Sequence, residues 1–337
     1  MEILKNLKKR KKLLITLLLL VIVIISIYLL DFSRPKVAWG VTFSQDYAQY
    51  ELGLDWKKTY LAILDDLKVD HLRLSAYWNQ VEAEKDQFDY SDLDWQVNEA
   101  SRRNVKIILA VGRRLPRWPE CHDPGWIASS TRQEIETKQL AYVENVVRRY
   151  DSNPNIIYWQ VENEPFLKYF GQCPALDKEF LKREVKQVKS LTSKPVLITT
   201  SGELSFWTPA GDIGGDVLGT TLYRVVYSPK FGYFHWFLPP AFYFIRVEAV
   251  KLFTPMKKVI VAELQAEPWH KEGENLPQMT SQQYSQSLDL NQFKSNINFS
   301  RRAGFTESYL WGAEWWYYLK DKRHDDSFWQ EAKKLWQ

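Results

Sequence analysis

The chain has 337 residues and a formal net charge of +4, but the excess of positive charge lies at one end. Residues 1–12 hold six of the 45 basic and one of the 41 acidic residues, which leaves 39 basic against 40 acidic residues beyond them. A nucleic-acid-binding domain needs a basic surface, so this composition argues against a nucleic-acid partner. The five His are scattered and no Cys-x-x-Cys pair is present, so we expect no metal and no cofactor.

An uncharged, apolar run follows the basic terminus and covers residues 13–30. As a helix this run would be about 27 Å long, close to the thickness of a bilayer's hydrocarbon core. Because basic flanks stay cytoplasmic, we expect residues 1–12 to form a cytoplasmic tail, residues 13–30 a single-pass anchor in the cell membrane, and residues 31–36 a short linker. The alternative is a cleaved signal peptide, but no small-x-small cleavage site follows the run, which favours the anchor.

Residues 37–337 are predicted to form one α/β domain outside the cytoplasm. Short β-rich runs alternate with longer amphipathic segments, and several runs are continuously apolar, which is typical of parallel strands covered on both faces. The eight predicted strands are Val37–Thr42, His71–Ala76, Val105–Val111, Ile156–Val161, Val196–Thr200, Val217–Leu222, Val259–Ala262 and Glu307–Trp311. The predicted helices are Trp56–Leu67, Leu93–Arg103, Arg132–Tyr150, Glu179–Leu191, Ala241–Phe253 and Ser281–Ala303.

This alternation favours a single (β/α)8 TIM barrel. A doubly wound open sheet is the alternative, and it would place a Gly-rich turn after the first strand, where this chain reads Ser-Gln-Asp-Tyr. In a barrel, the residues that carry chemistry lie at the carboxyl ends of the strands. Two Glu occupy such positions: Glu164 follows the fourth strand within Asn163-Glu164-Pro165, and Glu263 ends the seventh. Glycosidic bond cleavage uses two carboxyl groups that face each other across the scissile bond, so this pair predicts a glycosidase.

On these residues the chain resembles the clan A glycoside hydrolases, a (β/α)8 group that includes families 5, 39 and 42. The matching positions, in strand order, are Arg73, Asn163, Glu164, Tyr223, Glu263 and Trp311. The resemblance implies that Glu164 is the catalytic acid/base and Glu263 the nucleophile of a retaining double displacement. It also implies that Arg73 and Tyr223 hydrogen-bond the nucleophile, and that Trp311 forms a floor under the sugar at subsite −1.

The chain departs from the family 5 pattern at two strands. Family 5 proteins usually carry a His at the end of strand three and His-x-Tyr at strand six. Here strand three ends in Val111-Gly112-Arg113 and strand six in Thr221-Leu222-Tyr223, so neither His is present. The substrate is therefore not carried over from that family.

Fifteen Trp give the chain an aromatic content suited to sugar binding, because indoles pack on the apolar faces of sugar rings. In the loops at the predicted barrel mouth we expect Trp78, Trp269 and Gln265 to contact substrate. Nine Trp fall in predicted loops, and we expect about half of these nine to be core residues. Glu162 and Glu267 flank the two catalytic candidates and are interpreted as helpers or as bystanders.

Cys121 and Cys173 follow strands three and four, which are neighbours in a barrel, so we predict a disulfide between them. The aromatic segment 227–240 forms either a wall of the cleft or a contact with the membrane surface. Because the linker is short, we expect the bottom of the barrel to face the membrane, which favours the cleft wall.

The sequence thus predicts a membrane-anchored retaining O-glycoside hydrolase that acts on a carbohydrate outside the cytoplasm. The alternative function is a non-catalytic, membrane-anchored barrel that binds glycans through its aromatic cleft.

Overall fold

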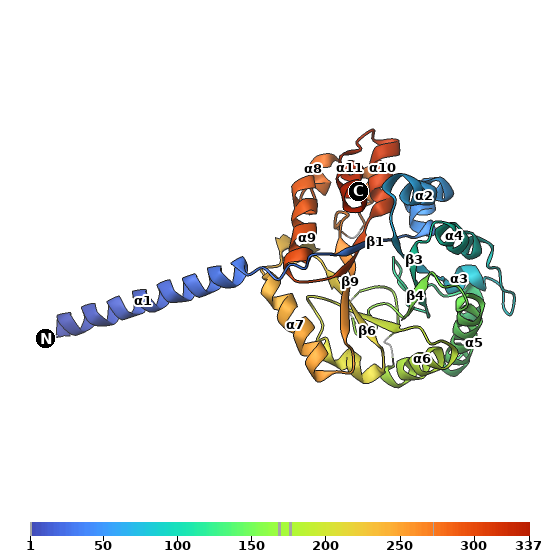
Figure 1. The fold of residues 1–337 in the computed structure, drawn as a ribbon, viewed down its shortest axis with the longest axis horizontal. Coiled ribbons are helices and arrows are strands. Elements are labelled where there is room, and N and C mark those ends of the chain that lie inside the picture. The colour runs from blue at the N-terminus through green and yellow to red at the C-terminus, as the bar shows by residue number, and fades with distance from the viewer. Residues whose placement is uncertain (1, 168–169, 175–176, 272) are drawn as a thin grey trace.

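The computed structural model describes residues 2–167, 170–174, 177–271 and 273–337. Eight parallel strands close into a barrel in the order β1-β10-β9-β6-β5-β4-β3-β2, with helices around it (Figure 1). The barrel strands are β1 (Ala38–Thr42), β2 (His71–Ser75), β3 (Lys106–Val111), β4 (Ile156–Val161), β5 (Val196–Thr200), β6 (Val217–Leu222), β9 (Lys258–Gln265) and β10 (Glu307–Trp311). The predicted (β/α)8 fold is confirmed.

The hydrophobic pattern located the strands well because each one is buried on both faces. Strands β4, β5, β6 and β10 have the predicted bounds, and β1, β2 and β3 differ by one residue at an end. The seventh barrel strand, β9, extends to Gln265, beyond the predicted end at Ala262. Glu263 therefore lies on the strand itself.

The larger helices of the outer ring are α2 (Trp56–Ala62), α4 (Ser91–Arg102), α5 (Arg132–Tyr150), α6 (Lys178–Leu191), α7 (Pro240–Phe253), α9 (Leu290–Arg302) and α10 (Ala313–Lys322). Shorter helices are α3 (Trp78–Val81), α8 (Ser281–Tyr284) and α11 (Ser327–Lys333). The predicted helix Ser281–Ala303 is in fact two helices, α8 and α9. The break occurs because Asp289 caps α9: its side chain accepts the backbone N–H of Gln292 at 2.7 Å.

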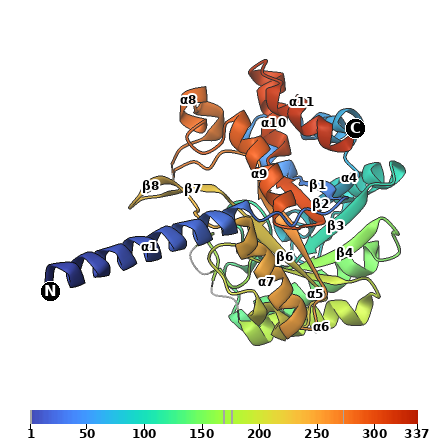
Figure 2. The ribbon, with the colours of Figure 1, turned by 60° about the vertical axis from the view of Figure 1, so that its left-hand side comes forward.

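The aromatic segment 227–240 contains an antiparallel hairpin that the sequence analysis did not predict. Its strands are β7 (Val225–Ser228) and β8 (Gly232–His235). The hairpin lies between β6 and α7, on the same side of the barrel as α1 (Figure 2).

A long apolar helix, α1 (Glu2–Leu29), precedes the barrel. Residues Lys9–Leu29 are long and apolar enough to cross a membrane, a statement about length and composition alone. Figure 1 shows the barrel nearly end-on, and α1 leaves it sideways, close to α7 and α9. Arg302, at the end of α9, donates to the carbonyl oxygen of Tyr28 at 2.6 Å. The helix thus departs from the barrel wall, which differs from our expectation that the bottom would face the membrane.

The lower half of the barrel interior is apolar. Ile108, Leu197, Ile260 and Tyr309 belong to one buried cluster that closes it. Gly40 makes room for this filling, because a Cβ there would lie 2.5 Å from Cδ1 of Tyr309. Below this filling, at the amino ends of the strands, Glu307 accepts hydrogen bonds from Lys258 and Tyr309, and a separate polar cluster lies in the upper half, at the carboxyl ends.

Candidate active site

Arg73 is the centre of a polar cluster in the upper half of the barrel. It is fully buried on β2. Its Nε donates to Oε1 of Gln160 at 2.7 Å, its Nη1 to Oε1 of Glu263 at 2.8 Å, and its Nη2 to Oδ1 of Asn163 at 2.7 Å. A buried guanidinium is tolerated when its donors are paired in this way. The cluster therefore ties together β2, the end of β4 and β9.

Glu263 is held at both of its carboxyl oxygens. Arg73 donates to Oε1, and the hydroxyl of Tyr223 donates to Oε2 at 3.1 Å. Burial and the charge of Glu263 raise the pKa of Tyr223 well above its usual value, so the phenol keeps its proton and acts as a donor. Two donors, one of them cationic, therefore hold the carboxyl group of Glu263 in place.

Glu164 has opposite surroundings. Its backbone N–H donates to Oγ1 of Thr199 at 2.8 Å, and its φ of 41° places it in the left-handed region. Its Oε1 is buried with no hydrogen-bond partner among the described residues. Burial, followed by the negative charges of Glu263 and Glu120, raises the pKa of Glu164 well above its ordinary value. These surroundings favour the protonated form of the Glu164 carboxyl group.

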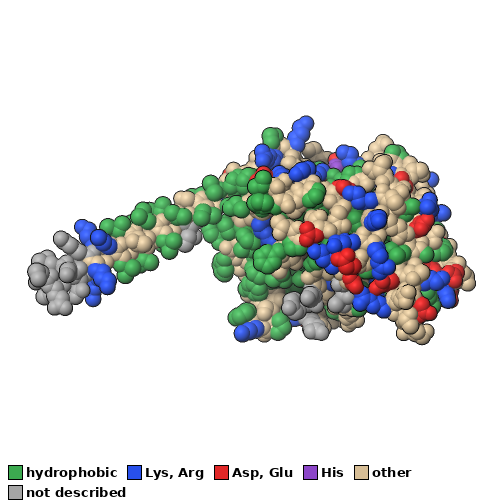
Figure 3. All heavy atoms as spheres, turned by 90° about the horizontal axis from the view of Figure 1, so that it is seen from below, with side chains coloured by type: hydrophobic (Ala, Val, Ile, Leu, Met, Phe, Trp, Pro, Cys, Tyr) green, Lys and Arg blue, Asp and Glu red, His purple; other side chains and the backbone are tan. Residues whose placement is uncertain are grey.

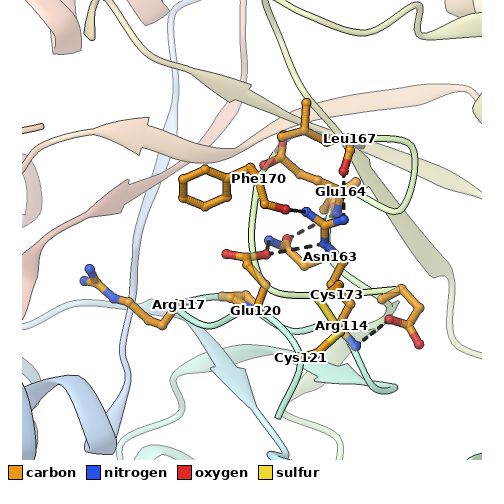
Figure 4. Close-up of polar contacts among 12 residues, drawn as sticks. Arg114, Arg117, Glu120, Cys121, Asn163, Glu164, Leu167, Phe170 and Cys173 are labelled. Atoms are coloured by element: carbon orange, nitrogen blue, oxygen red, sulfur yellow. Dashed lines mark hydrogen bonds and ion pairs between the residues drawn. A yellow bond between two sulfur atoms is a disulfide. The ribbon is translucent and has the colours of Figure 1, made fainter. Parts of the chain in front are cut away.

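A third buried carboxyl group, Glu120, lies at the same place and was missed by the sequence analysis. It comes from the loop after β3 and accepts a hydrogen bond from Nδ2 of Asn163 at 3.1 Å (Figure 4). Burial and the charge of Glu263 raise the pKa of Glu120 to about 8. Its only sequence signal is its position beside Cys121. No group of three or more His, Cys, Asp or Glu side chains within the described part of the chain is arranged to hold a metal ion.

Glu162 positions the start of the loop that carries Glu120. This fully buried side chain accepts the backbone N–H groups of Arg113 at 2.9 Å and Arg114 at 2.6 Å. Gly112, with a φ of 123°, leaves space for it, because a Cβ there would lie 2.5 Å from Oε1 of Glu162. Of the two interpretations offered for Glu162, its contacts support a helper of the loop.

The same loop is tied to the segment after β4. Cys121 and Cys173 form the predicted disulfide, with their Cα atoms 5.4 Å apart. Arg114 reinforces it by donating to the carbonyl oxygens of Leu167 and Phe170, both at 2.8 Å (Figure 4). Two loops from neighbouring strands thus form one connected side of the site.

Arg117 brings the tip of this loop to Trp311. Its guanidinium carbon lies 4.1 Å from the centre of the Trp311 ring and 3.7 Å from that of Tyr47. It pairs with Glu267, 3.2 Å from Nη2 to Oε2, and with Glu314 at 3.3 Å. Trp311 in turn donates from Nε1 to Oε1 of Glu267 at 2.8 Å. Glu267 therefore accepts hydrogen bonds from both Arg117 and the indole of Trp311. Arg117 is a second residue that the sequence analysis missed.

Two residues that were expected to bind substrate make contacts within the protein instead. Trp78 is fully buried among helices and donates to Oε2 of Glu82 at 2.8 Å, so it is a core residue. Gln265 uses its side chain to hold the hairpin: its Oε1 accepts the N–H groups of Arg224 at 2.8 Å and Val225 at 2.9 Å. Its Nε2 donates to the carbonyl oxygen of Val225 at 2.6 Å, so its polar atoms are used within the protein. We correct both interpretations accordingly.

Trp269 does lie beside the carboxyl cluster. Its ring is half-buried and meets Tyr223 edge-on, with ring centres 5.3 Å apart. The ring of Phe170, from the disulfide-linked segment, lies 6.1 Å from it. These side chains form an aromatic border next to Glu263.

The first half of the barrel matches a known family. A comparison with protein families matches residues 40–202 to Cellulase (glycosyl hydrolase family 5). This stretch runs from β1 through β5 and includes Arg73 and Glu164. Glu263 lies beyond the matched residues, so its place in the site rests on the geometry described above.

Curated and solved relatives are distant. Beta-galactosidase BgaA of Clostridium cellulovorans is 23% identical over 196 residues, which cover 51% of this chain and 29% of that protein, so the chain spans less than a third of that relative. GH5_18 from Streptomyces cattleya in complex with GlcNAc has a TM-score of 0.59 at 13% identity and covers 83% of this chain and 71% of its own. Xylanase 10B from Thermotoga petrophila has a TM-score of 0.57 at 12% identity and covers 82% of each chain.

The closed barrel is shared with these solved glycoside hydrolases, and the sequence is similar to family 5 over residues 40–202, slightly less than half of the chain. The two solved structures show the fold alone, because their identity to this chain is so low.

Proposed function

We propose that the chain is a retaining O-glycoside hydrolase in which Glu263 is the nucleophile and Glu164 the acid/base. One observation carries the proposal: two buried Glu at the barrel mouth have opposite protonation environments. Glu263 accepts hydrogen bonds from Arg73 and Tyr223, whereas burial and nearby negative charge raise the pKa of Glu164. Double displacement requires such a pair, with one carboxylate ionised and one carboxylic acid protonated.

In the first step Glu263 attacks the anomeric carbon of the bound sugar. A bond forms between its carboxylate oxygen and that carbon, while the bond from the carbon to the leaving oxygen breaks. Glu164 transfers its proton to the leaving oxygen, so the departing group is a neutral alcohol. The product of this step is a glycosyl ester on Glu263.

Esterification then changes the protonation of Glu164. The charge of Glu263 is one cause of the raised pKa of Glu164, and the ester removes that charge. Glu164, which has given its proton to the leaving group, is therefore more stable as a carboxylate and accepts a proton from an incoming water. The water attacks the anomeric carbon from the side that the leaving group occupied, and Glu263 is released as a carboxylate. Configuration is therefore retained over the two steps.

We propose that the sugar at this centre contacts Asn163, Tyr223, Trp269 and Trp311. Asn163 supplies an amide beside Glu164, and Trp311 supplies an indole face near Glu267. The substrate class is a poly- or oligosaccharide. The names of the relatives suggest galactosides, xylosides and N-acetylglucosaminides as the first sugars to test.

The proposed location is the outer face of the cell membrane. Residues 13–30 would form the single-pass anchor, with residues 1–12 in the cytoplasm and residues 37–337 as the catalytic domain. The disulfide between Cys121 and Cys173 supports this orientation, because such bonds persist in oxidising compartments.

A non-catalytic glycan-binding barrel is the competing function, and one observation favours it. Glu164 and Glu263 are only 6% and 4% exposed, and Arg117 stacks against Trp311, so the loop after β3 covers much of the carboxyl cluster. A binding protein would use the aromatic border at Trp269 and leave the carboxyl groups unused.

Labelling the nucleophile separates the two functions. Full-length protein in detergent is incubated with activated 2-deoxy-2-fluoro glycosides of the sugars named above, and its intact mass is measured. The proposal expects a covalent adduct that maps to Glu263 and is absent in Glu263→Gln. Binding to glycan arrays with no adduct and no hydrolysis would establish the binding protein instead.

A further inference from the structure

One side of the barrel exposes large apolar side chains. Ile245, Leu252 and Phe253 point outward from α7, and Phe206 and Phe237 lie on segments beside it; all five are 65–86% exposed. We call these five residues the α7 patch. Exposed apolar groups scattered singly need no explanation, but a contiguous patch marks a surface that contacts something other than water.

The helix beneath this patch is apolar on both faces. Tyr243, Val247 and Val250 pack inward on the barrel, while the residues of the patch point away from it. Apolar side chains therefore occupy much of the outward face of α7 as well as its inward face, beside the polar Arg246, Glu248 and Lys251. Arg246 ties the neighbouring segment to α7 by donating to the carbonyl oxygen of Gly202 at 2.6 Å, which brings the loop of Phe206 to the same surface.

The patch is continuous with the end of α1. The hydroxyl of Tyr28 donates to the carbonyl oxygen of Phe237. The ring of Phe32 stacks on that of Phe244 in α7, with ring centres 3.9 Å apart. Arg302 holds the last turn of α1 from the other side. Figure 3 shows apolar side chains running along α1 and on to the adjoining side of the barrel.

We infer that the α7 patch rests on the lipid surface next to the point where α1 enters the bilayer. The inference rests on α1 crossing a membrane and is independent of the chemistry at Glu164 and Glu263. A helix that leaves the barrel wall sideways brings that wall, and with it α7, down to the bilayer plane (Figure 1). Exposed Phe, Leu and Ile side chains are suited to the boundary between headgroups and acyl chains.

The polar residues around the patch fit the same partner. Lys257 is exposed just beyond α7, and its ammonium group donates to the carbonyl oxygen of Lys251 at 3.1 Å; Lys251 itself lies on the same turn as Leu252. Glu248 is the one acidic residue on the outward face of α7, and it is paired with Lys251 at 2.8 Å. The wall thus presents an apolar surface bordered by Lys251 and Lys257.

A single fluorescent label tests this contact. Cys121 and Cys173 are bonded to each other, so an introduced Cys is the one free thiol. Full-length Leu252→Cys is labelled with an environment-sensitive fluorophore and reconstituted in vesicles of phosphatidylcholine and phosphatidylglycerol that contain an acyl-chain-brominated lipid. The matched control is Phe88→Cys, an exposed apolar position between α3 and α4, a segment on the opposite side of the barrel from α1 (Figure 1).

We expect blue-shifted emission and quenching by brominated lipid several-fold stronger at Leu252 than at Phe88. Equal, weak quenching at both positions would overturn the inference. So would a blue shift at Leu252 that lipid does not quench and that grows with protein density, because a second copy of the chain would then cover the patch. Glycosidase activity is measured on the same samples, so a failure of catalysis is distinguished from a failure of docking.

A second variant removes the apolar contact itself. Ile245→Ser/Leu252→Ser/Phe253→Ser changes side chains that point away from the barrel, so thermal unfolding in detergent should shift little. With the label moved to Phe237→Cys, lipid quenching should fall at least twofold relative to the same label without the serines. Unchanged quenching would show that the outward face of α7 does not contact lipid.

Discussion

The ends of β4 and β9 carry the same residue type in opposite surroundings. Glu263 on β9 receives a cationic donor from Arg73 and a phenolic donor from Tyr223. Glu164 after β4 has an Oε1 with no partner in the described structure, and burial, followed by the charges of Glu263, Glu120 and Glu203, raises its pKa. The two carboxyl groups are similarly buried, so the difference between them lies in the donors and charges that surround each one.

The largest expected loss of activity comes from replacing Glu263, the proposed nucleophile. Glu263→Gln should reduce kcat on the order of 10⁴-fold or more, because no other group can form the glycosyl ester. Steady-state hydrolysis of the best glycoside from the panel measures it. Glu248→Gln on the exposed face of α7 is the matched control and should hydrolyse at the wild-type rate. Activity within tenfold of wild type in Glu263→Gln would refute the assignment.

Replacing Glu164, the proposed acid/base, should give a smaller loss of activity that depends on the leaving group. Glu164→Gln should lower kcat by roughly 10²–10⁴-fold for alkyl glycosides, which need protonation of the leaving oxygen. For aryl glycosides with acidic leaving groups the first step should be nearly normal, and the glycosyl ester should accumulate because no base activates water. Intact-mass detection follows that ester. Equal losses on both substrate types would argue that Glu164 is not the acid.

Removing one hydrogen-bond donor from Glu263 should make the surroundings of its carboxyl group more like those of Glu164. Tyr223→Phe deletes the hydroxyl that donates to Oε2 of Glu263 and leaves the ring beside Trp269. One lost hydrogen bond of about 0.5–1.5 kcal/mol corresponds to a roughly two- to tenfold loss in kcat/KM. The pH–rate profile and kcat/KM measure it together. Tyr233→Phe on the hairpin is the control. A loss beyond a hundredfold would mean that Tyr223 does more than hold the nucleophile.

Replacing Glu120 tests the surroundings of Glu164 through the pH dependence of activity. The negative charge of Glu120 is one cause of the raised pKa of Glu164, and the proposed mechanism requires protonated Glu164. Glu120→Gln should therefore move the alkaline limb of kcat/KM to lower pH, by roughly half a unit to one unit. An unmoved limb, or one that moves to higher pH, would remove Glu120 from the electrostatics of the site.

Glu120 also couples folding to pH. Its pKa is raised to about 8 in the folded chain from 4.5, so the native state binds more protons than the unfolded state between those values. Stability should therefore fall as pH rises from about 4.5 to 8, and Glu120→Gln should flatten that slope. Urea unfolding at several pH values within this window measures the slope for both proteins. Identical slopes would contradict the raised pKa.

The fold and the two central carboxyl groups could be predicted because their signals are local. A barrel strand is covered on both faces, so β4, β5, β6 and β10 are short, nearly continuous apolar runs with readable ends. Glu164 and Glu263 follow such runs, and strand order then places them on one face. The disulfide was predicted for the same reason, since Cys121 and Cys173 follow adjacent strands.

The places of the remaining site residues depend on contacts between segments that are distant in the sequence. Trp78 and Gln265 occupy positions typical of a binding site, but one packs in the core and the other holds the hairpin, because those contacts satisfy an indole N–H and a buried amide. Glu120 and Arg117 come from a loop without periodicity, and only its closure by Glu162 and the disulfide brings them to Asn163 and Trp311.

The sequence by itself determined the class of fold, the pair of Glu and the apolar first helix, because strand burial and bilayer length leave direct patterns in the order of residues. Only the tertiary structure decided which donors and charges surround each Glu and which side of the barrel meets α1. Protonation depends on the charges and donors within a few ångströms of a carboxyl group, and the direction of α1 depends on contacts of Tyr28 and Phe32 with α7 and α9. These are distances between residues far apart in the chain, and no local pattern encodes them.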